Sequence, residues 1–192
     1  MPIIETPRDH HYPWYVRWVF GSQKRRYGAV LESARLWART PRVFAALSLL
    51  YAAFERRSSP LAPELRTLII VRVSQINGCS FCVDLNSATG LRRGVASAKL
   101  AALPRYADSA LFTERERAAL SYAEAVTGPG NPPAPLERLR QHFNEDAIIE
   151  LTGLIAFQNM SSKFNTALGV APQGFCPLAP AAPAAGTDPD QR

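Results

Sequence analysis

Apolar residues recur at intervals of three and four along most of the chain, which is the pattern of amphipathic helices. In the segment 63–77 the repeat consists of Leu65, Leu68, Ile69, Val73 and Ile76. No segment shows the apolar–polar alternation that is typical of a half-buried strand. The pattern therefore predicts an all-α domain of about eight helices.

Prolines, glycines and capping residues set the expected helix boundaries. Thr113 and Glu116 form a capping box, which predicts a helix from there to Thr127. Asn77-Gly78 ends one helix just before Cys79, and Gly94 is expected to cap the next. With the apolar repeats, these signals predict helices at about 14–27, 30–39, 42–57, 63–77, 79–93, 95–103, 113–127 and 145–168, and a short one that ends near 142.

Two of these helices carry further expectations. The helix at 42–57 is apolar on most of its surface, so we expect it to be buried. The helix at 145–168 carries one stripe that is apolar at first and then bears amide and hydroxyl groups: Ile148, Leu151, Ile155, Gln158, Ser162 and Asn165. The amides of Gln158, Asn159 and Asn165 either line a pocket against the helix at 79–93 or bridge neighbouring helices, and the sequence leaves both possibilities open.

The composition is that of a globular protein and places the helices in one compact unit. The chain has 192 residues, of which 47% are apolar and 20% charged, and this excludes disordered and collagen-like classes. We expect an N-terminal helical extension at 1–60 that packs on a core at 61–170. The Ala/Pro-rich segment 171–192 cannot bury enough surface to order itself and is predicted to be a loose tail.

The positive charge is concentrated near the N-terminus. The formal charge is +6, and residues 1–60 hold ten Lys or Arg against four acids, so the rest of the chain is neutral. Such an imbalance can mark contact with nucleic acid or acidic lipid. Here the basic residues are interleaved with acids and large apolar groups, which favours a solvated face or a subunit contact. We therefore expect no nucleic-acid partner.

The sequence predicts neither a membrane span nor a secretion signal. The longest apolar stretch, 43–54, has 12 residues, whereas crossing a bilayer needs about 20. The N-terminus lacks a basic start followed by an apolar run. The expected location is the cytoplasm, where thiols stay reduced and a close cysteine pair points to redox or metal chemistry.

Two cysteines are placed one helical turn apart at a predicted helix start. Cys79 follows Asn77-Gly78, and Cys82 comes three residues later. Residues i and i+3 have Cβ atoms about 5–6 Å apart, and a disulfide needs about 3.5–4.5 Å, so a small adjustment opens or closes the bond. The N–H groups and dipole of a helix start also favour the reactive thiolate.

Three interpretations of this pair remain open at this point. It could be a dithiol that cycles with a disulfide, or two buried cysteines that serve only as packing. It could also be half of a zinc site, whose other ligands would come from Cys176, His142 or the pair His10-His11. The redox interpretation is favoured.

The segment from Leu65 to Cys82, LRTLIIVRVSQINGCSFC, resembles the core of the carboxymuconolactone decarboxylase and AhpD-like alkylhydroperoxidase superfamily. Residues 163–170 and 174–176 resemble the C-terminal motifs of its peroxidase-related members. The resemblance implies an all-helical AhpD-like fold and assembly as a homo-oligomer, as a dimer, trimer or hexamer. It implies no cofactor and no metal.

The resemblance also implies roles for the cysteines. Cys82 would be the residue that peroxide oxidises, Cys79 would resolve it to a disulfide, and a partner with a dithiol would reduce the bond. Peroxidase members have a glutamate twelve residues before the first cysteine and a histidine four after the second, and here those positions hold Thr67 and Asn86. Neither side chain can move a proton near neutral pH, whereas histidine can.

Three residues remain as supporting candidates. Asn86 can donate a hydrogen bond to a thiolate one turn away, and Thr67 can hold a water molecule. Glu64, one turn before Thr67, could replace the missing acid, but a first-turn glutamate that complements its helix dipole is the favoured interpretation.

The resemblance thus predicts a cytoplasmic thiol peroxidase that reduces hydroperoxides through Cys82 and Cys79. Its activity would be weakened or altered by the loss of the two proton-relay groups. The alternatives are a non-catalytic oligomeric helical scaffold and a cofactor-free decarboxylase, which would need a proton relay and no cysteine pair.

Overall fold

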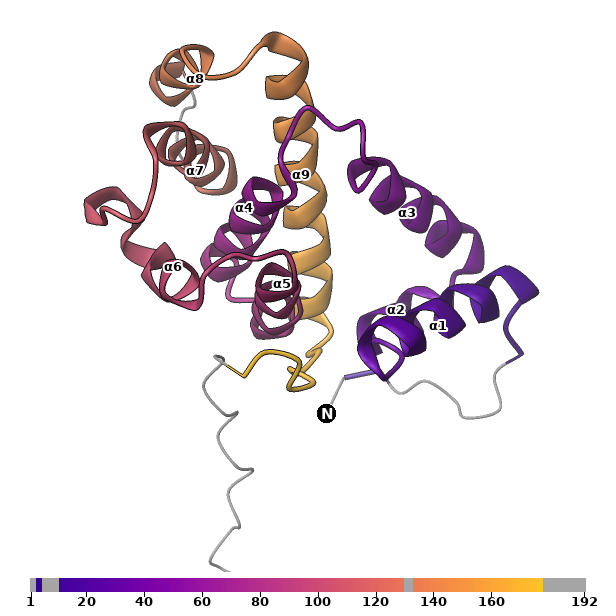
Figure 1. Ribbon diagram of the computed structural model, residues 1–192. Coiled ribbons are helices and arrows are strands. Elements are labelled where there is room, and N and C mark those ends of the chain that lie inside the picture. The colour runs from indigo at the N-terminus through magenta and orange to yellow at the C-terminus, as the bar shows by residue number, and fades with distance from the viewer. Residues whose placement is uncertain (1–2, 5–10, 130–132, 178–192) are drawn as a thin grey trace, which may run out of the picture.

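The structure, a computed structural model, describes residues 3–4, 11–129 and 133–177, and these residues form helices and no strand (Figure 1). This confirms the predicted all-α fold. The elements are α1 (Trp14–Tyr27), α2 (Glu32–Trp37), α3 (Pro41–Phe54), α4 (Pro63–Ile76), α5 (Ser80–Arg92), α6 (Ser97–Ala102), the 3-10 helix η1 (Leu103–Asp108), α7 (Glu114–Thr127), α8 (Pro133–Arg140) and α9 (Glu145–Ala167). None of the described helices is long and apolar enough to cross a bilayer.

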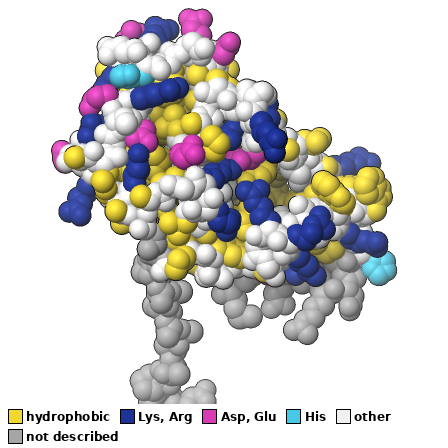
Figure 2. Space-filling model, viewed as in Figure 1, with side chains coloured by type: hydrophobic (Ala, Val, Ile, Leu, Met, Phe, Trp, Pro, Cys, Tyr) yellow, Lys and Arg dark blue, Asp and Glu magenta, His cyan; other side chains and the backbone are white. Residues whose placement is uncertain are grey.

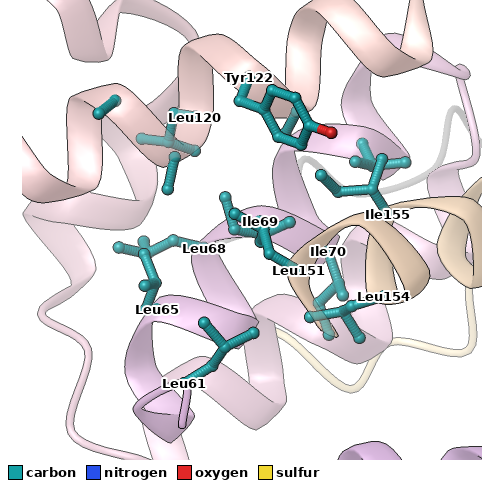
Figure 3. Packing of buried hydrophobic residues seen from close by; sticks show 14 of the residues in the cluster. Leu61, Leu65, Leu68, Ile69, Ile70, Leu120, Tyr122, Leu151, Leu154 and Ile155 are labelled. Atoms are coloured by element: carbon teal, nitrogen blue, oxygen red, sulfur yellow. The ribbon is translucent and has the colours of Figure 1, made fainter. Parts of the chain in front are cut away.

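Helix α4 lies at the centre of the main core and packs against α5, α7 and α9 (Figure 1). Figure 3 shows Leu68 and Ile69 of α4 between Leu120 of α7 and Leu151 of α9, and all four side chains are fully buried. A helix surrounded on several sides needs apolar residues over most of its circumference. The run LIIV at 68–71 supplies them, so its sequence accounts for the central place of α4.

Helices α1, α2 and α3 form a separate group beside this core, drawn in indigo and purple in Figure 1. They have a small core of their own, made of Val16, Phe20, Val30, Ala34, Ala38 and Phe44. Arg66 of α4 joins the two parts, because its buried guanidinium donates to the carbonyl oxygen of Phe54 at 2.6 Å. Residues 14–54 of the basic N-terminal segment therefore form a folded layer.

The prediction that the helix at 42–57 is buried is wrong for the single chain. In α3 only Phe44 is buried, and Leu49 is 73% exposed. The helix packs on α1 and α2, and part of its remaining surface faces a pocket. Apolar composition indicates that a helix face needs cover, but it does not say whether the same chain provides that cover.

The chain after Pro104 also differs from the prediction. We expect Pro104 to end the helix at 95–103; α6 does end at Ala102, and the chain then continues into the 3-10 helix η1, which the sequence did not predict. Pro104 lies in the first turn of η1, where the missing N–H has no helical partner to lose.

Part of the predicted loose tail is anchored. Asp84 of α5 is fully buried, and its carboxylate accepts backbone N–H bonds from Gln173 at 3.0 Å, Phe175 at 3.1 Å and Cys176 at 2.7 Å. Residues 171–177 therefore lie against the cysteine helix, contrary to the expectation of a tail that starts at 171. The remainder of that segment, 178–192, lies outside the described residues.

The capping box predicted at the start of α7 is present. Its Glu116 carboxyl should make the stability of the protein depend on pH. Burial alone would raise the pKa of the Glu116 carboxyl, but hydrogen bonds from Lys99 at 2.6 Å and from the backbone of Thr113 at 2.8 Å outweigh it and lower the pKa. A lowered folded pKa stabilises the protein above the ordinary glutamate pKa of about 4.3, and this stability is lost as pH falls through the folded value.

Glu116→Gln should therefore lower the free energy of unfolding by about 1 kcal/mol at pH 7 and flatten its decline between about pH 5 and pH 3. Glutamine keeps one acceptor for the capping box but does not titrate. Urea unfolding at several pH values measures both effects, with Glu137→Gln on the exposed face of α8 as the control. An equally steep acid decline in both variants would contradict the assignment.

Candidate active site

The two cysteines lie at the junction of α4 and α5. Gly78 has a φ of 63°, in the left-handed region that glycine adopts without strain, and it turns the chain from one helix into the next. Cys79 is the N-cap of α5, and Cys82 lies one turn later, with the two Cα atoms 5.3 Å apart. The two side chains are joined in a disulfide. The position of the pair at a helix start, one turn apart, is the one that the spacing predicted.

The two sulfur atoms have different surroundings. Each cysteine is only 2% exposed, but Cys82 lines a pocket of about 370 Å³ that α1, α2 and α3 form with α5 and α9. Cys79 does not line this pocket, although both cysteines belong to one apolar cluster with Leu36, Phe81 and Val170. Of the two cysteines, only Cys82 borders the space that a ligand would occupy.

Each sulfur atom accepts one N–H hydrogen bond. The backbone N–H of Cys82 donates to Cys79 Sγ at 3.3 Å, and Asn165 Nδ2 donates to Cys82 Sγ at 3.3 Å. The Asn165 amide is 1% exposed, and its oxygen accepts a 2.6 Å bond from the Ser33 hydroxyl. Because Ser33 occupies the oxygen, the NH₂ group of Asn165 is directed to Cys82. Both donors would stabilise negative charge on sulfur.

Of the supporting candidates, the structure brings Asn86 to the cysteines and leaves Thr67 and Glu64 apart from them. Asn86 is half-buried and lines the pocket with Cys82. Thr67 is fully buried near Gly90 and Arg93, and its hydroxyl accepts a 2.9 Å bond from Arg93. Glu64 is exposed in the first turn of α4. Neither Thr67 nor Glu64 lines the pocket.

The amides of α9 divide between the two roles that the sequence left open. Gln158 and Asn165 line the pocket. Gln158 also bridges helices, because its buried amide donates to the hydroxyls of Ser74 and Ser162 at 2.9 Å. Asn159 points elsewhere: it accepts a bond from Asn77 and donates to Thr127. The expected stripe from Ile148 to Asn165 is buried throughout.

Sequence reasoning missed the role of Ser33 and did not assign Asn165 to the cysteine. Asn165 carried a signal, since it closes a buried stripe whose polar residues need partners. Ser33 carried none, because it lies 132 positions away from Asn165 in the chain. Only the folding of α2 onto α9 brings them together.

A further contact holds α2 in place over the pocket. The side-chain oxygen of Gln173 accepts the backbone N–H of Glu32, the first residue of α2, at 2.9 Å. The backbone of Gln173 is itself bound to Asp84. The anchored segment 171–177 thus links the cysteine helix to the helix that carries Ser33.

Metal binding has no support in the described part of the chain. Within residues 3–4, 11–129 and 133–177, no three His, Cys, Asp or Glu side chains form a group that could hold a metal ion. Of the residues considered as zinc ligands, His10 lies outside the described ranges. Cys176 is a buried free cysteine.

Comparisons with known proteins show the family of this chain. Residues 41–125, from α3 into α7, match the sequence model of the carboxymuconolactone decarboxylase family. The uncharacterized protein YnjA of Escherichia coli K12 is 43% identical over 155 residues, which cover 80% of this chain and 85% of YnjA. The residues that match the family model, 41–125, include both cysteines of the pair and end before α9.

Solved structures share the fold at lower identity. A peroxidase-related protein of Ralstonia eutropha JMP134, described as having an alkylhydroperoxidase AhpD core, superposes with a TM-score of 0.82 at 22% identity, over 91% of this chain and 94% of that one. The debrominase Bmp8 superposes with a TM-score of 0.76 at 22% identity, over 84% of this chain and 88% of its own. At this identity the two structures show a common fold.

Proposed function

Because this chain belongs to the carboxymuconolactone decarboxylase family and has the fold of its AhpD-like members, we propose that it is a thiol peroxidase that reduces hydroperoxides through Cys82 and Cys79. One observation carries the proposal. Cys82 lines a pocket and its Sγ accepts the Asn165 N–H, while its disulfide partner Cys79 does not line that pocket. This asymmetry gives the two cysteines different parts in the reaction.

The reaction proceeds in two steps from the reduced pair. The Cys82 thiolate attacks the distal oxygen of the hydroperoxide, an S–O bond forms, the O–O bond breaks, and the alkoxide takes a proton from water. Cys79 then attacks the Cys82 sulfenic acid, which forms the disulfide and releases water. The two thiols supply both electrons, and an external dithiol returns them and regenerates the pair.

The hydrogen bonds at sulfur support this assignment of roles. Asn165 would stabilise the attacking thiolate of Cys82, and the helix-start N–H of Cys82 would stabilise the thiolate of Cys79 when the disulfide is reduced. An external thiol that attacks Cys82 through the pocket would thus expel Cys79 as a stabilised leaving group. Asn86, also in the pocket, is a further donor for the thiolate.

The chemistry of the pocket favours this reaction over decarboxylation. Decarboxylation of a lactone acid requires a group that moves a proton, and none of the described residues that line the pocket is His, Asp or Glu. A thiolate attack needs only a stabilised sulfur and a protonated leaving group. A role of the pair in packing alone is disfavoured as well, because Cys82 lines the pocket.

Peroxide titration of the reduced protein tests the proposal. One equivalent of cumene hydroperoxide should remove two thiols per chain, leave Cys176 free, and produce a Cys79–Cys82 disulfide in the peptide mass spectrum. Dithiothreitol should restore both thiols. If Cys79 and Cys82 stay reduced after prolonged exposure to peroxide, the proposal fails.

Asn165→Ala should slow the oxidation of Cys82 without stopping it. A hydrogen bond to a charged group contributes about 1.5–3 kcal/mol, so we expect the second-order rate constant to fall about tenfold to hundredfold. Stopped-flow tryptophan fluorescence or thiol quenching measures this rate. The control is Asn159→Ala, which removes an amide from the same helix outside the pocket. Equal rates in both variants would show that Asn165 does not act on the thiolate.

A further inference from the structure

Several aromatic side chains line the pocket. Trp37, Tyr51, Phe81 and Phe157 line it, together with further apolar side chains from α1 and α3. Trp37 is held in place by stacking on Phe164, with ring centroids 3.6 Å apart. The neutral polar side chains of Ser33, Gln158 and Asn165, among others, interrupt this surface. Rigid aromatic walls favour a flat apolar ligand over a small polar molecule such as hydrogen peroxide.

The pocket contains one charged side chain. Among the described residues that line it, Arg26 is the only charged one, and no acid accompanies it. Arg26 lies in the last turn of α1 and is exposed, whereas Cys82 is almost fully buried. Its guanidinium lies 5.4 Å from the centre of the Tyr27 ring and forms no ion pair within the described part of the chain. The lining of the pocket thus combines a buried cysteine with an exposed cation.

The surroundings of the pocket add to this positive field. Residues 14–54 hold seven Lys or Arg and a single acid, Glu32. Arg92 also places its guanidinium 5.0 Å from the centre of the Tyr27 ring. On the face shown in Figure 2, dark blue side chains gather over the N-terminal helices, while magenta ones lie over the other part of the molecule. Such a field attracts anions to the pocket.

We propose that this pocket selects hydroperoxides that have an aromatic body and a carboxylate, with the peroxide group at Cys82 and the carboxylate at Arg26. The inference rests on the proposed function and names the substrate class of the same site. The volume of about 370 Å³ lies near the lower end of the range for small-molecule pockets, about 300–1,000 Å³. It suits a ligand with one aromatic ring. The aromatic walls hold the ring, and the single cation fixes which end points inward.

The test compares cumene hydroperoxide with its para-carboxylate, which adds one carboxylate group to the same aromatic body, and dithiothreitol serves as the electron donor for both. The wild-type protein should prefer the carboxylate about fivefold in kcat/KM, since an exposed ion pair contributes up to about 1 kcal/mol. Arg26→Gln should remove this preference, so that the ratio of the two kcat/KM values falls to about one. Arg25→Gln, an exposed neighbour that does not line the pocket, should keep most of it.

The outcomes separate this inference from the proposed function. Equal kcat/KM for both substrates in the wild-type protein, or equal losses in the two arginine variants, overturns the inference and leaves the peroxidase proposal standing. If neither hydroperoxide is reduced, the peroxidase proposal fails. The preference of the pocket for an aromatic carboxylate is then tested by ligand binding alone. In that case 4-isopropylbenzoate should quench the tryptophan fluorescence of the wild-type protein. Weaker quenching in Arg26→Gln, but not in Arg25→Gln, would support the inference. Equal quenching by neutral isopropylbenzene would overturn it.

Discussion

Cys82→Ser should lower hydroperoxide reduction to the background rate. Cys79→Ser should still consume one equivalent of peroxide per chain and then stop. The reason is that Cys82 lines the pocket and Cys79 does not. Without Cys79 the reaction stops at the sulfenic acid of Cys82, because no neighbouring thiol can form the disulfide. The two variants thus differ in chemistry although the two residues are one helical turn apart.

Labelling with dimedone followed by peptide mass spectrometry measures the difference. The label should appear on Cys82 in the Cys79→Ser protein and on no cysteine in the Cys82→Ser protein. Cys176→Ser is the control, since this buried cysteine does not line the pocket and its loss should leave the peroxide rate unchanged. A sulfenic acid on Cys79, or full activity of Cys82→Ser, would reverse the assigned roles.

Asp84→Ala should cause the largest loss of stability, about 2–4 kcal/mol in the free energy of unfolding. The carboxylate is fully buried and accepts the N–H groups of Gln173, Phe175 and Cys176. Its removal leaves three donors without their acceptor, so the segment 171–177 must detach to reach water. Since Gln173 also holds the start of α2, the pocket wall that carries Ser33 should loosen as well.

Two measurements test this effect at different scales. Urea unfolding gives the global loss, and hydrogen exchange should show faster exchange of the Gln173, Phe175 and Cys176 amides. Asp108 is an exposed acid at the end of η1, and Asp108→Ala is the control. It should change neither the free energy of unfolding nor the exchange of these amides by much. If the three amides exchange at the same rate in Asp84→Ala and in the wild-type protein, the carboxylate does not anchor this segment.

Most of the helices could be predicted from the sequence because the signals for them are local. A capping box, a proline or a glycine acts within one turn, and the apolar repeat of α4 reports its buried faces directly. The exposed surface of α3 could not be predicted in this way. Its apolar residues show that the helix needs cover, but which surfaces meet depends on the path of the whole chain.

The candidate site divides along the same line. Cys79 and Cys82 could be identified because a three-residue spacing at a helix start is itself the chemical signal. Asn86 followed from its place one turn later. Thr67 had the right place in the family pattern, yet its short side chain is bound to Arg93 near the other end of α5. Spacing along a helix locates a residue, but side-chain length and neighbours decide what it reaches.

By itself, the sequence determined the all-helical fold, the family and the cysteine pair, since each depends on residues within a few helical turns of one another. Only the tertiary structure decided which cysteine lines the pocket, that Ser33 directs Asn165 to Cys82, and that Asp84 holds the C-terminal segment in place. These contacts join residues 83 to 132 positions apart. Their formation depends on how α2, α5, α9 and the segment 171–177 pack, and no local pattern encodes that packing.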